Sequence, residues 1–184
     1  MADTDSFDFV EASDTVRALL PASLTTQTFF RGTIPDSDLK TAFVSAFNEG
    51  AFMVTYVGHG SVEVWRGDLF TSPDARGLTN GSTLPVVVAM TCLNGLFQDM
   101  YSESVAEALI RNPSGGAVAV YASSGLTEPY AQSLMHRQFV TTLFGAPPVR
   151  LGDAIIPAKS ATPDPDVRKT WILIGDPSMG PTVP

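Results

Sequence analysis

Two residues that could together form a thiolate–imidazolium pair each follow an apolar run of the sequence. His59 comes after AFMVTYV (51–57), between Gly58 and Gly60, and Cys92 comes directly after LPVVVAMT (84–91). A thiolate is a strong nucleophile, and a neighbouring imidazole can take up its proton and return it. The pair could therefore supply a nucleophile and a general acid/base for covalent catalysis.

Each residue also has an ordinary structural interpretation. Cys92 could be an inert core thiol, because free cysteine is among the most buried residue types. His59 could be a turn residue between two glycines, although Gly58 and Gly60 would also let a substrate backbone approach closely. Both residues end a buried strand and precede turn residues, which favours the catalytic interpretation. The other histidine, His136, is predicted to lie on a helix surface without a role.

The elements that would position this pair alternate between strands and helices. Continuous apolar runs predict buried strands, and helical spacing with capping signals predicts helices between them. The expected strands are 25–30, 51–57, 84–91, 116–123 and 170–174, and the expected helices lie near 16–20, 36–49, 104–112, 131–144 and 152–160. This alternation is typical of an α/β fold with a mostly parallel sheet. The functional site of such a sheet lies beyond the carboxyl ends of its strands, where His59 and Cys92 are placed.

Composition restricts the remaining possibilities. The chain has 184 residues, the size of one domain, and its 19 acidic and 11 basic residues give a net charge of −8. Such a charge argues against binding to a nucleic-acid backbone. A single cysteine excludes an internal disulfide and a cysteine-rich zinc site. No apolar run approaches the roughly 18 residues of a membrane span, and the acidic N-terminal segment is unlike a signal peptide.

The sequence around both candidate residues resembles a known family. TYVGHGS (55–61), followed by Trp65, is similar to the histidine motif of the gingipain-type cysteine peptidases, which belong to the caspase-like clan. MTCLNGLF (90–97) resembles their nucleophile motif, and the separation of the two residues (92 − 59 = 33) suits that family. Other similar stretches are GGAVAVYASSGLT (115–127), LGDAIIPAK (151–159) and WILIGDPS (171–178), so the resemblance covers most of the chain from about residue 14.

The resemblance implies a cysteine endopeptidase with a three-layer caspase-like fold, residues 1–184 forming one partial peptidase domain. It assigns Cys92 as the nucleophile, His59 as the general acid/base, and the backbone N–H groups of Gly60 and Cys92 as the oxyanion hole. The candidates for substrate contacts are strand-end and loop residues: Tyr56, Gly58, Thr91, Ser123, Ser124, Glu128 and Tyr130. The implied partner is a protein or peptide substrate, and the implied location is outside a bacterial cell or on its surface.

The scheme implied by the resemblance needs no cofactor. Some members of the family bind calcium, and Asp3, Asp5 and Asp8 carry the oxygen ligands that calcium prefers. A solvated acidic terminus is the favoured interpretation of these residues. No preference for the residue before the scissile bond is predicted.

Two other functions remain open at this point. Some gingipain relatives act as sortase-like transpeptidases, in which an amine rather than water resolves the thioester. A caspase-like scaffold kept only for protein binding is the second alternative, and its cysteine would be a buried, unreactive thiol.

The resemblance also predicts that two parts of the family's catalytic domain are missing. A first strand, central in the sheet, and a carboxylate beyond it that orients the histidine would both precede Met1. A truncation, a processed second chain or a compact variant would each explain this. We then expect the 25–30 strand to lack its inner neighbour, a place that an N-terminal fragment, a second copy or the acidic N-terminal segment would fill.

Overall fold

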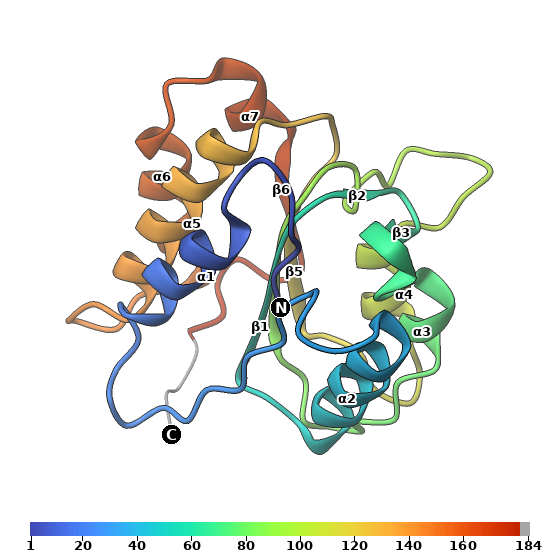
Figure 1. Cartoon of the computed structure of the whole chain (residues 1–184). Coiled ribbons are helices and arrows are strands. Elements are labelled where there is room, and N and C mark those ends of the chain that lie inside the picture. The colour runs from blue at the N-terminus through green and yellow to red at the C-terminus, as the bar shows by residue number, and fades with distance from the viewer. Residues whose placement is uncertain (181–184) are drawn as a thin grey trace.

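The computed structural model describes residues 1–180, and its centre is a four-stranded sheet (Figure 1). The strands are β1 (Met53–Val57), β4 (Val86–Met90), β5 (Ala119–Ser123) and β6 (Trp171–Ile174), in the order β1-β4-β5-β6. The β1, β4 and β5 strands are parallel, and β6 runs antiparallel to β5. The predicted mostly parallel sheet is therefore confirmed.

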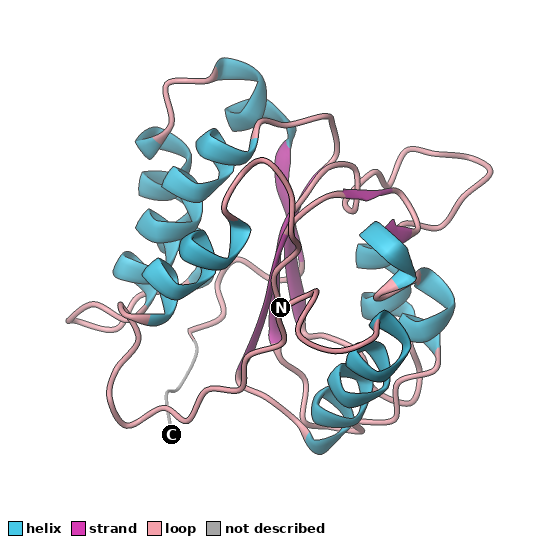
Figure 2. Cartoon of the chain, viewed as in Figure 1, coloured by secondary structure: helices cyan, strands magenta, loops and turns pink. Residues whose placement is uncertain are grey.

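Helices cover both faces of the sheet, as Figure 2 shows. One layer holds α2 (Asp36–Glu49), α3 (Ser72–Arg76) and α4 (Val105–Arg111), and the other holds α1 (Phe9–Arg17), α5 (Pro129–Leu143) and α6 (Leu151–Ala161). A short helix, α7 (Pro165–Thr170), leads directly into β6. The period of two along β4 divides its side chains between two cores: Val87 and Ala89 face one, and Val88 and Met90 face the other. This double burial explains why the strand is apolar throughout.

The helix that follows the cysteine loop begins where its sequence predicts. Ser104 caps α4 by accepting a hydrogen bond from the Glu107 backbone N–H, and the Glu107 carboxylate accepts one from Ser104 N (3.0 Å). This reciprocal arrangement satisfies two of the helix's free N–H groups. At the other end of the chain, Asp8 caps α1, which lies earlier in the sequence than the helix expected at 16–20.

The prediction of a strand over residues 25–30 is wrong. Only Phe30 forms a bridge, with Ala2, and the preceding residues make no strand. Residues 1–3 lie between this segment and β1: Ala2 N–H donates to Phe29 O, and Val57 N–H donates to Met1 O (both 3.0 Å). The N-terminal segment thus fills part of the predicted vacant place, and this short pairing is too limited to form a strand.

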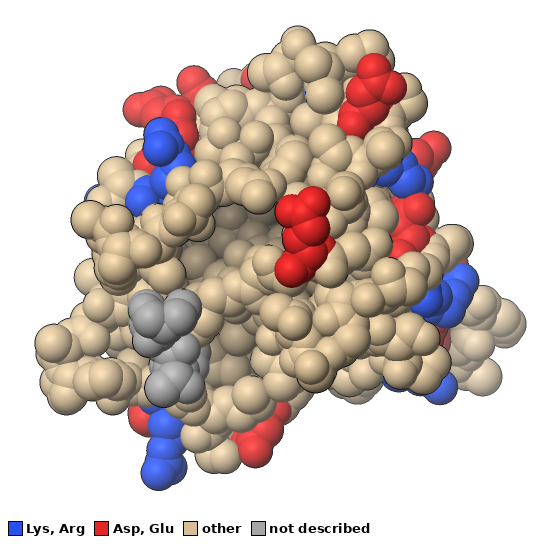
Figure 3. All heavy atoms as spheres, turned by 90° about the horizontal axis from the view of Figure 1, so that it is seen from below, with Lys and Arg blue, Asp and Glu red and all other residues tan. Residues whose placement is uncertain are grey.

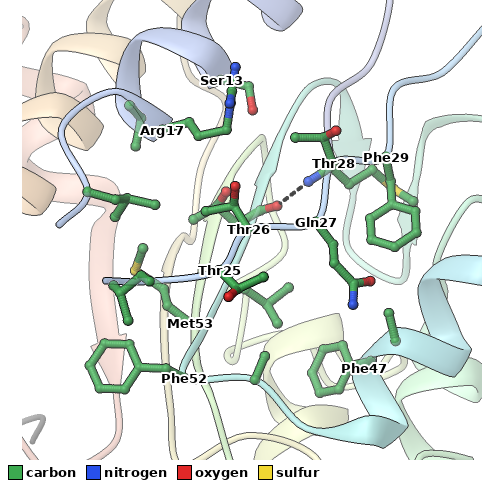
Figure 4. A pocket seen from close by; sticks show the side chains of 18 of the residues that line it. Ser13, Arg17, Thr25, Thr26, Gln27, Thr28, Phe29, Phe47, Phe52 and Met53 are labelled. Atoms are coloured by element: carbon green, nitrogen blue, oxygen red, sulfur yellow. Dashed lines mark hydrogen bonds between the residues drawn. The ribbon is translucent and has the colours of Figure 1, made fainter. Parts of the chain in front are cut away.

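At the Met1 end of residues 1–3, the gap between β1 and the segment 23–30 continues as a cavity of about 510 Å³. Its walls come from α1, α2, the start of β1 and the segment 23–30. Figure 4 shows Ser13 and Arg17 of α1 on one side of the opening and Phe47 and Phe52 on the other. Figure 3 views the molecule from below and shows a hollow in this face, bordered mainly by uncharged residues.

His136 is buried, which contradicts the prediction of a surface residue. Its exposed fraction is 1%, because α5 packs against both α6 and the sheet. Burial lowers the pKa of His136 to about 3, so the imidazole is neutral in the folded chain. No described helix has the length and hydropathy that a membrane crossing requires.

Candidate active site

The two candidate catalytic residues lie at the same edge of the sheet. β1 and β4 are adjacent and parallel, and Val57 pairs with Met90 at their carboxyl ends. His59 and Cys92 each follow two residues after those ends. The helix α4 then starts beyond the cysteine loop, with Ser104 as its cap. This is the arrangement that the positions of the two residues in the sequence predict.

A carboxylate lies beside the His59 imidazole. Asp5 Oδ2 is 3.3 Å from His59 Nε2, and the Phe9 ring stands edge-on to the imidazole with 5.2 Å between ring centroids. Hydrogen bonds from the Ser6 backbone N–H and from Arg66 hold the pKa of Asp5 below its ordinary value, so Asp5 stays ionised. The prediction that no residue of this chain supplies an orienting carboxylate is therefore wrong. With Nε2 facing Asp5, Nδ1 is the nitrogen left to exchange a proton.

The backbone of His59 is fixed by three further groups. Asp3, which is fully buried, accepts from His59 N–H (3.3 Å), and the Tyr56 hydroxyl donates to His59 O (2.7 Å). Arg66 N–H donates to the same carbonyl (2.9 Å). A Cβ at position 58 would lie 2.5 Å from both Asp3 Cβ and the Tyr56 hydroxyl, so only glycine fits before the histidine.

Cys92 is partly exposed, and its thiol contacts a loop that follows β5. Its Sγ atom lies 3.4 Å from Thr127 N, 3.5 Å from Thr127 O and 3.7 Å from Thr127 Oγ1. Gln132, which is buried, donates to the Thr127 hydroxyl. These contacts show that the loop after β5 covers one side of the thiol. On the other side of Cys92 in the sequence, Leu93 adopts a left-handed conformation (φ 60°), a strained geometry for a residue with a side chain.

A short hairpin connects the histidine loop with the cysteine loop. It consists of β2 (Gly60–Ser61) and β3 (Val64–Trp65). Trp65 Nε1 donates to Asn94 Oδ1 (2.8 Å), and the Asn94 amide donates to Ser61 O. At position 60 a Cβ would lie 2.6 Å from Thr91 Oγ1, so glycine permits the close approach of the two loops. Trp65 and Asn94 both lie in or next to the family motifs, but neither residue's partner is evident from the sequence.

Some of the predicted substrate-contacting residues are not accessible. The side chains of Tyr56, Thr91 and Ser123 have exposed fractions of 0%, and Gly58 is also buried. These four residues are therefore packed away from solvent, and their assignment to substrate contacts stays a prediction. The other candidates remain open to solvent: Ser124 is partly exposed, and Glu128 and Tyr130 are exposed. The assignment of the Gly60 and Cys92 N–H groups to an oxyanion hole stays a prediction.

The three aspartates considered for calcium have other partners. Arg31 is 3.2 Å from Asp3, Arg66 contacts Asp5, and Asp8 caps α1. Within residues 1–180, no group of three or more histidine, cysteine or acidic side chains is arranged to hold a metal ion.

Comparison with known proteins identifies the family. The model of peptidase family C25 matches residues 1–182. The chain belongs to peptidase family C25. Gingipain R2 of Porphyromonas gingivalis is 28% identical over 153 residues, which cover 74% of this chain and 20% of that protein. Gingipain R1 of the same species is 26% identical over 151 residues, which cover 74% of this chain and 15% of that protein. The C25 chain thus spans about a fifth or less of these curated relatives.

Solved structures of gingipains share the fold of this C25 chain. The crystal structure of the Arg-specific cysteine proteinase gingipain R gives a TM-score of 0.80 at 24% identity, covering 92% of this chain and 42% of that one. The complex of the RgpB pro- and mature domains gives 0.82 at 22% identity, covering 96% and 47%. The predicted gingipain-type fold is therefore confirmed.

Proposed function

We propose that this chain is a cysteine endopeptidase that cleaves protein substrates through Cys92 and His59. The observation that carries the proposal is the placement of Cys92 at the same sheet edge as a histidine whose Nε2 already faces a carboxylate. Asp5 beside Nε2 would orient the ring so that Nδ1 is the nitrogen that exchanges protons. By the family resemblance, the site of action is outside a bacterial cell or on its surface.

The proposed reaction has two steps in which each proton has a defined route. His59 takes the Cys92 proton, the thiolate sulfur bonds to the substrate carbonyl carbon, and the oxygen becomes an oxyanion near Gly60 N–H and Cys92 N–H. The C–N bond then breaks as His59 protonates the leaving amine, which leaves a thioester. Water, deprotonated by His59, attacks the thioester carbonyl carbon. The C–S bond breaks, the carboxylic acid product leaves, and the sulfur recovers the proton from His59.

The nature of the acceptor can be tested directly by product analysis. The folded chain is incubated with an unfolded protein in ¹⁸O-labelled water, with and without an added amine, and the products are analysed by mass spectrometry. An endopeptidase gives new carboxyl termini that carry ¹⁸O. Products joined to the amine in preference to ¹⁸O would instead indicate a transpeptidase, and the absence of any cleavage would favour a binding scaffold.

We further propose that the cavity beside β1 accepts an extended segment running parallel to β1 and leading into Met1. Val57 pairs with residues 1 and 3 through its N–H and C=O groups. Thr55 O already accepts from the Met1 ammonium (2.7 Å). Since alternate residues of a strand direct these groups to the same side, the Thr55 N–H and both groups of Met53 point toward the cavity. Phe29, which accepts from Ala2 N–H, lies on the opposite wall. The cavity thus offers strand pairing on both sides and apolar walls above and below.

Extending the chain before Met1 tests this proposal. We expect about five alternating Val and Thr residues to raise the melting temperature, by about 2–4 °C for each kcal/mol gained. The amides of Thr55 and Phe29 should also gain protection from hydrogen exchange. A Gly-Ser extension of equal length is the control, because it pairs poorly. Equal melting temperatures and unprotected amides in both extended chains would contradict the proposal, and a concentration-dependent melting temperature of the original chain would point to a second copy instead.

A further inference from the structure

The Asp5 oxygen that faces His59 also contacts a guanidinium. Asp5 Oδ2 is 3.3 Å from His59 Nε2 and forms a shorter ion pair with Arg66 Nη1. The same nitrogen of Arg66 donates to Thr4 O (3.4 Å), and the Arg66 backbone N–H donates to His59 O (2.9 Å). One residue is therefore bound both to the histidine backbone and to the carboxylate that faces the histidine ring.

The backbone of Arg66 is held firmly, although its side chain is partly exposed. It directly follows Trp65, whose indole is fully buried, stacks on Tyr56 with 4.1 Å between ring centroids, and bonds to Asn94. Asp5, in contrast, lies in an exposed stretch, residues 4–6, between the buried Asp3 and the start of α1. The Ser6 N–H that bonds to Asp5 Oδ1 (2.7 Å) belongs to the same exposed stretch, so Arg66 is the partner that ties the carboxylate to a buried part of the fold.

We propose that Arg66 is a positioning residue for His59: it holds the Asp5 carboxylate against Nε2, so that Nδ1 remains free to exchange a proton with Cys92. The inference rests on the proposed function, because holding His59 in one tautomer matters only if His59 exchanges a proton with Cys92. Its physical content is a defined tautomer of the neutral imidazole, with the proton on Nε2, the nitrogen that lies 3.3 Å from the Asp5 carboxylate.

The charged groups around His59 determine how a substitution at Asp5 or Arg66 should change the imidazole tautomer. Asp5 faces the ring, Asp3 bonds to the backbone N–H, and Arg66 contacts Asp5 and lies 3.8 Å from Asp3. Arg31 pairs with Asp3 on its far side (3.2 Å), and Phe9 supplies an apolar edge. The Arg66 guanidinium forms no hydrogen bond to the imidazole, so its side chain acts on the tautomer through Asp5, the carboxylate that faces the ring.

Nitrogen NMR of His59 in the folded chain at alkaline pH measures the tautomer without reference to peptidase activity. We expect the original chain to hold the proton on Nε2, and both Asp5→Ala and Arg66→Gln to give a mixture of tautomers. Arg66→Lys, which keeps a cation, should restore part of the original signal. Arg17→Gln is the matched control: it removes the same charge, but Arg17 pairs with Asp14 on the surface of α1. An unchanged tautomer in Arg66→Gln would overturn the inference.

The rate of Cys92 alkylation by iodoacetamide gives a second measurement. A displaced base can slow a reaction by up to about 10²-fold, so we expect Arg66→Gln to lower the rate within that range. If Arg66 acts through Asp5, the double variant should lose no more than Asp5→Ala alone. Additive losses would contradict a positioning role. A changed tautomer in a chain that cleaves no peptide would reject the proposed function and leave the Asp5–Arg66 inference standing.

Discussion

Replacing Cys92 with alanine is expected to abolish labelling by iodoacetamide and to reduce peptide hydrolysis on the order of 10⁴-fold or more. Cys92 is the single cysteine of the chain, so one label per folded molecule can come from no other thiol. The residue is partly exposed at the sheet edge, where the reagent is expected to reach it. The measurement is intact-mass analysis of the folded chain together with a peptidase assay on the same samples.

The variant His59→Ala tests whether the reactivity of the Cys92 thiol depends on the imidazole or only on access of the reagent. It should fold, because the His59 side chain is 45% exposed, and it should label more slowly because no base takes the thiol proton. His136→Gln is the control, since the neutral buried imidazole of His136 lies outside the site. A Cys92 that reacts only after denaturation, or equally fast without His59, would contradict the catalytic assignment.

The sequence predicts the parts of the site that depend on local pattern. β4 is apolar at every position because both of its faces are buried, so its end, and with it Cys92, can be located from composition alone. The largely apolar run 51–57 locates β1 and His59 in a similar way, and Ser104 with Glu107 marks the start of α4. Parallel order then brings the two strand ends to one edge. These features require no knowledge of contacts between distant residues.

The parts that the sequence does not predict depend on such distant contacts. Asp5 reaches His59 from 54 positions away (59 − 5 = 54), and nothing in an acidic N-terminal segment distinguishes it from a solvated one. Thr127 meets Cys92 through a loop after another strand. Residues 25–30 have the composition of a strand, yet only Phe30 finds a partner in Ala2. His136 is buried because the neighbouring helix α6 covers α5, which helical spacing alone does not show.

Trp65 is expected to be the side chain whose loss damages both the core and the cysteine loop. Its indole is fully buried, stacks on Tyr56 and lies 4.9 Å from the Phe70 ring, measured between centroids. Trp65→Ala should lower the free energy of unfolding by about 3–5 kcal/mol. At about 2–4 °C per kcal/mol, that change is a fall in melting temperature of roughly 6–20 °C, measurable by calorimetry.

Trp65→Phe isolates the hydrogen bond from the packing. The phenyl ring keeps most of the apolar contact but leaves the buried Asn94 Oδ1 without the indole N–H, which costs about 1–3 kcal/mol. Because Asn94 lies two residues after Cys92, the alkylation rate of Cys92 should change as well. Trp171→Phe is the matched control, since Trp171 is equally buried and its Nε1 has no hydrogen-bond partner within residues 1–180. If the two phenylalanine variants lose the same stability and alkylate at the same rate, the Trp65–Asn94 bond does not hold the nucleophile loop.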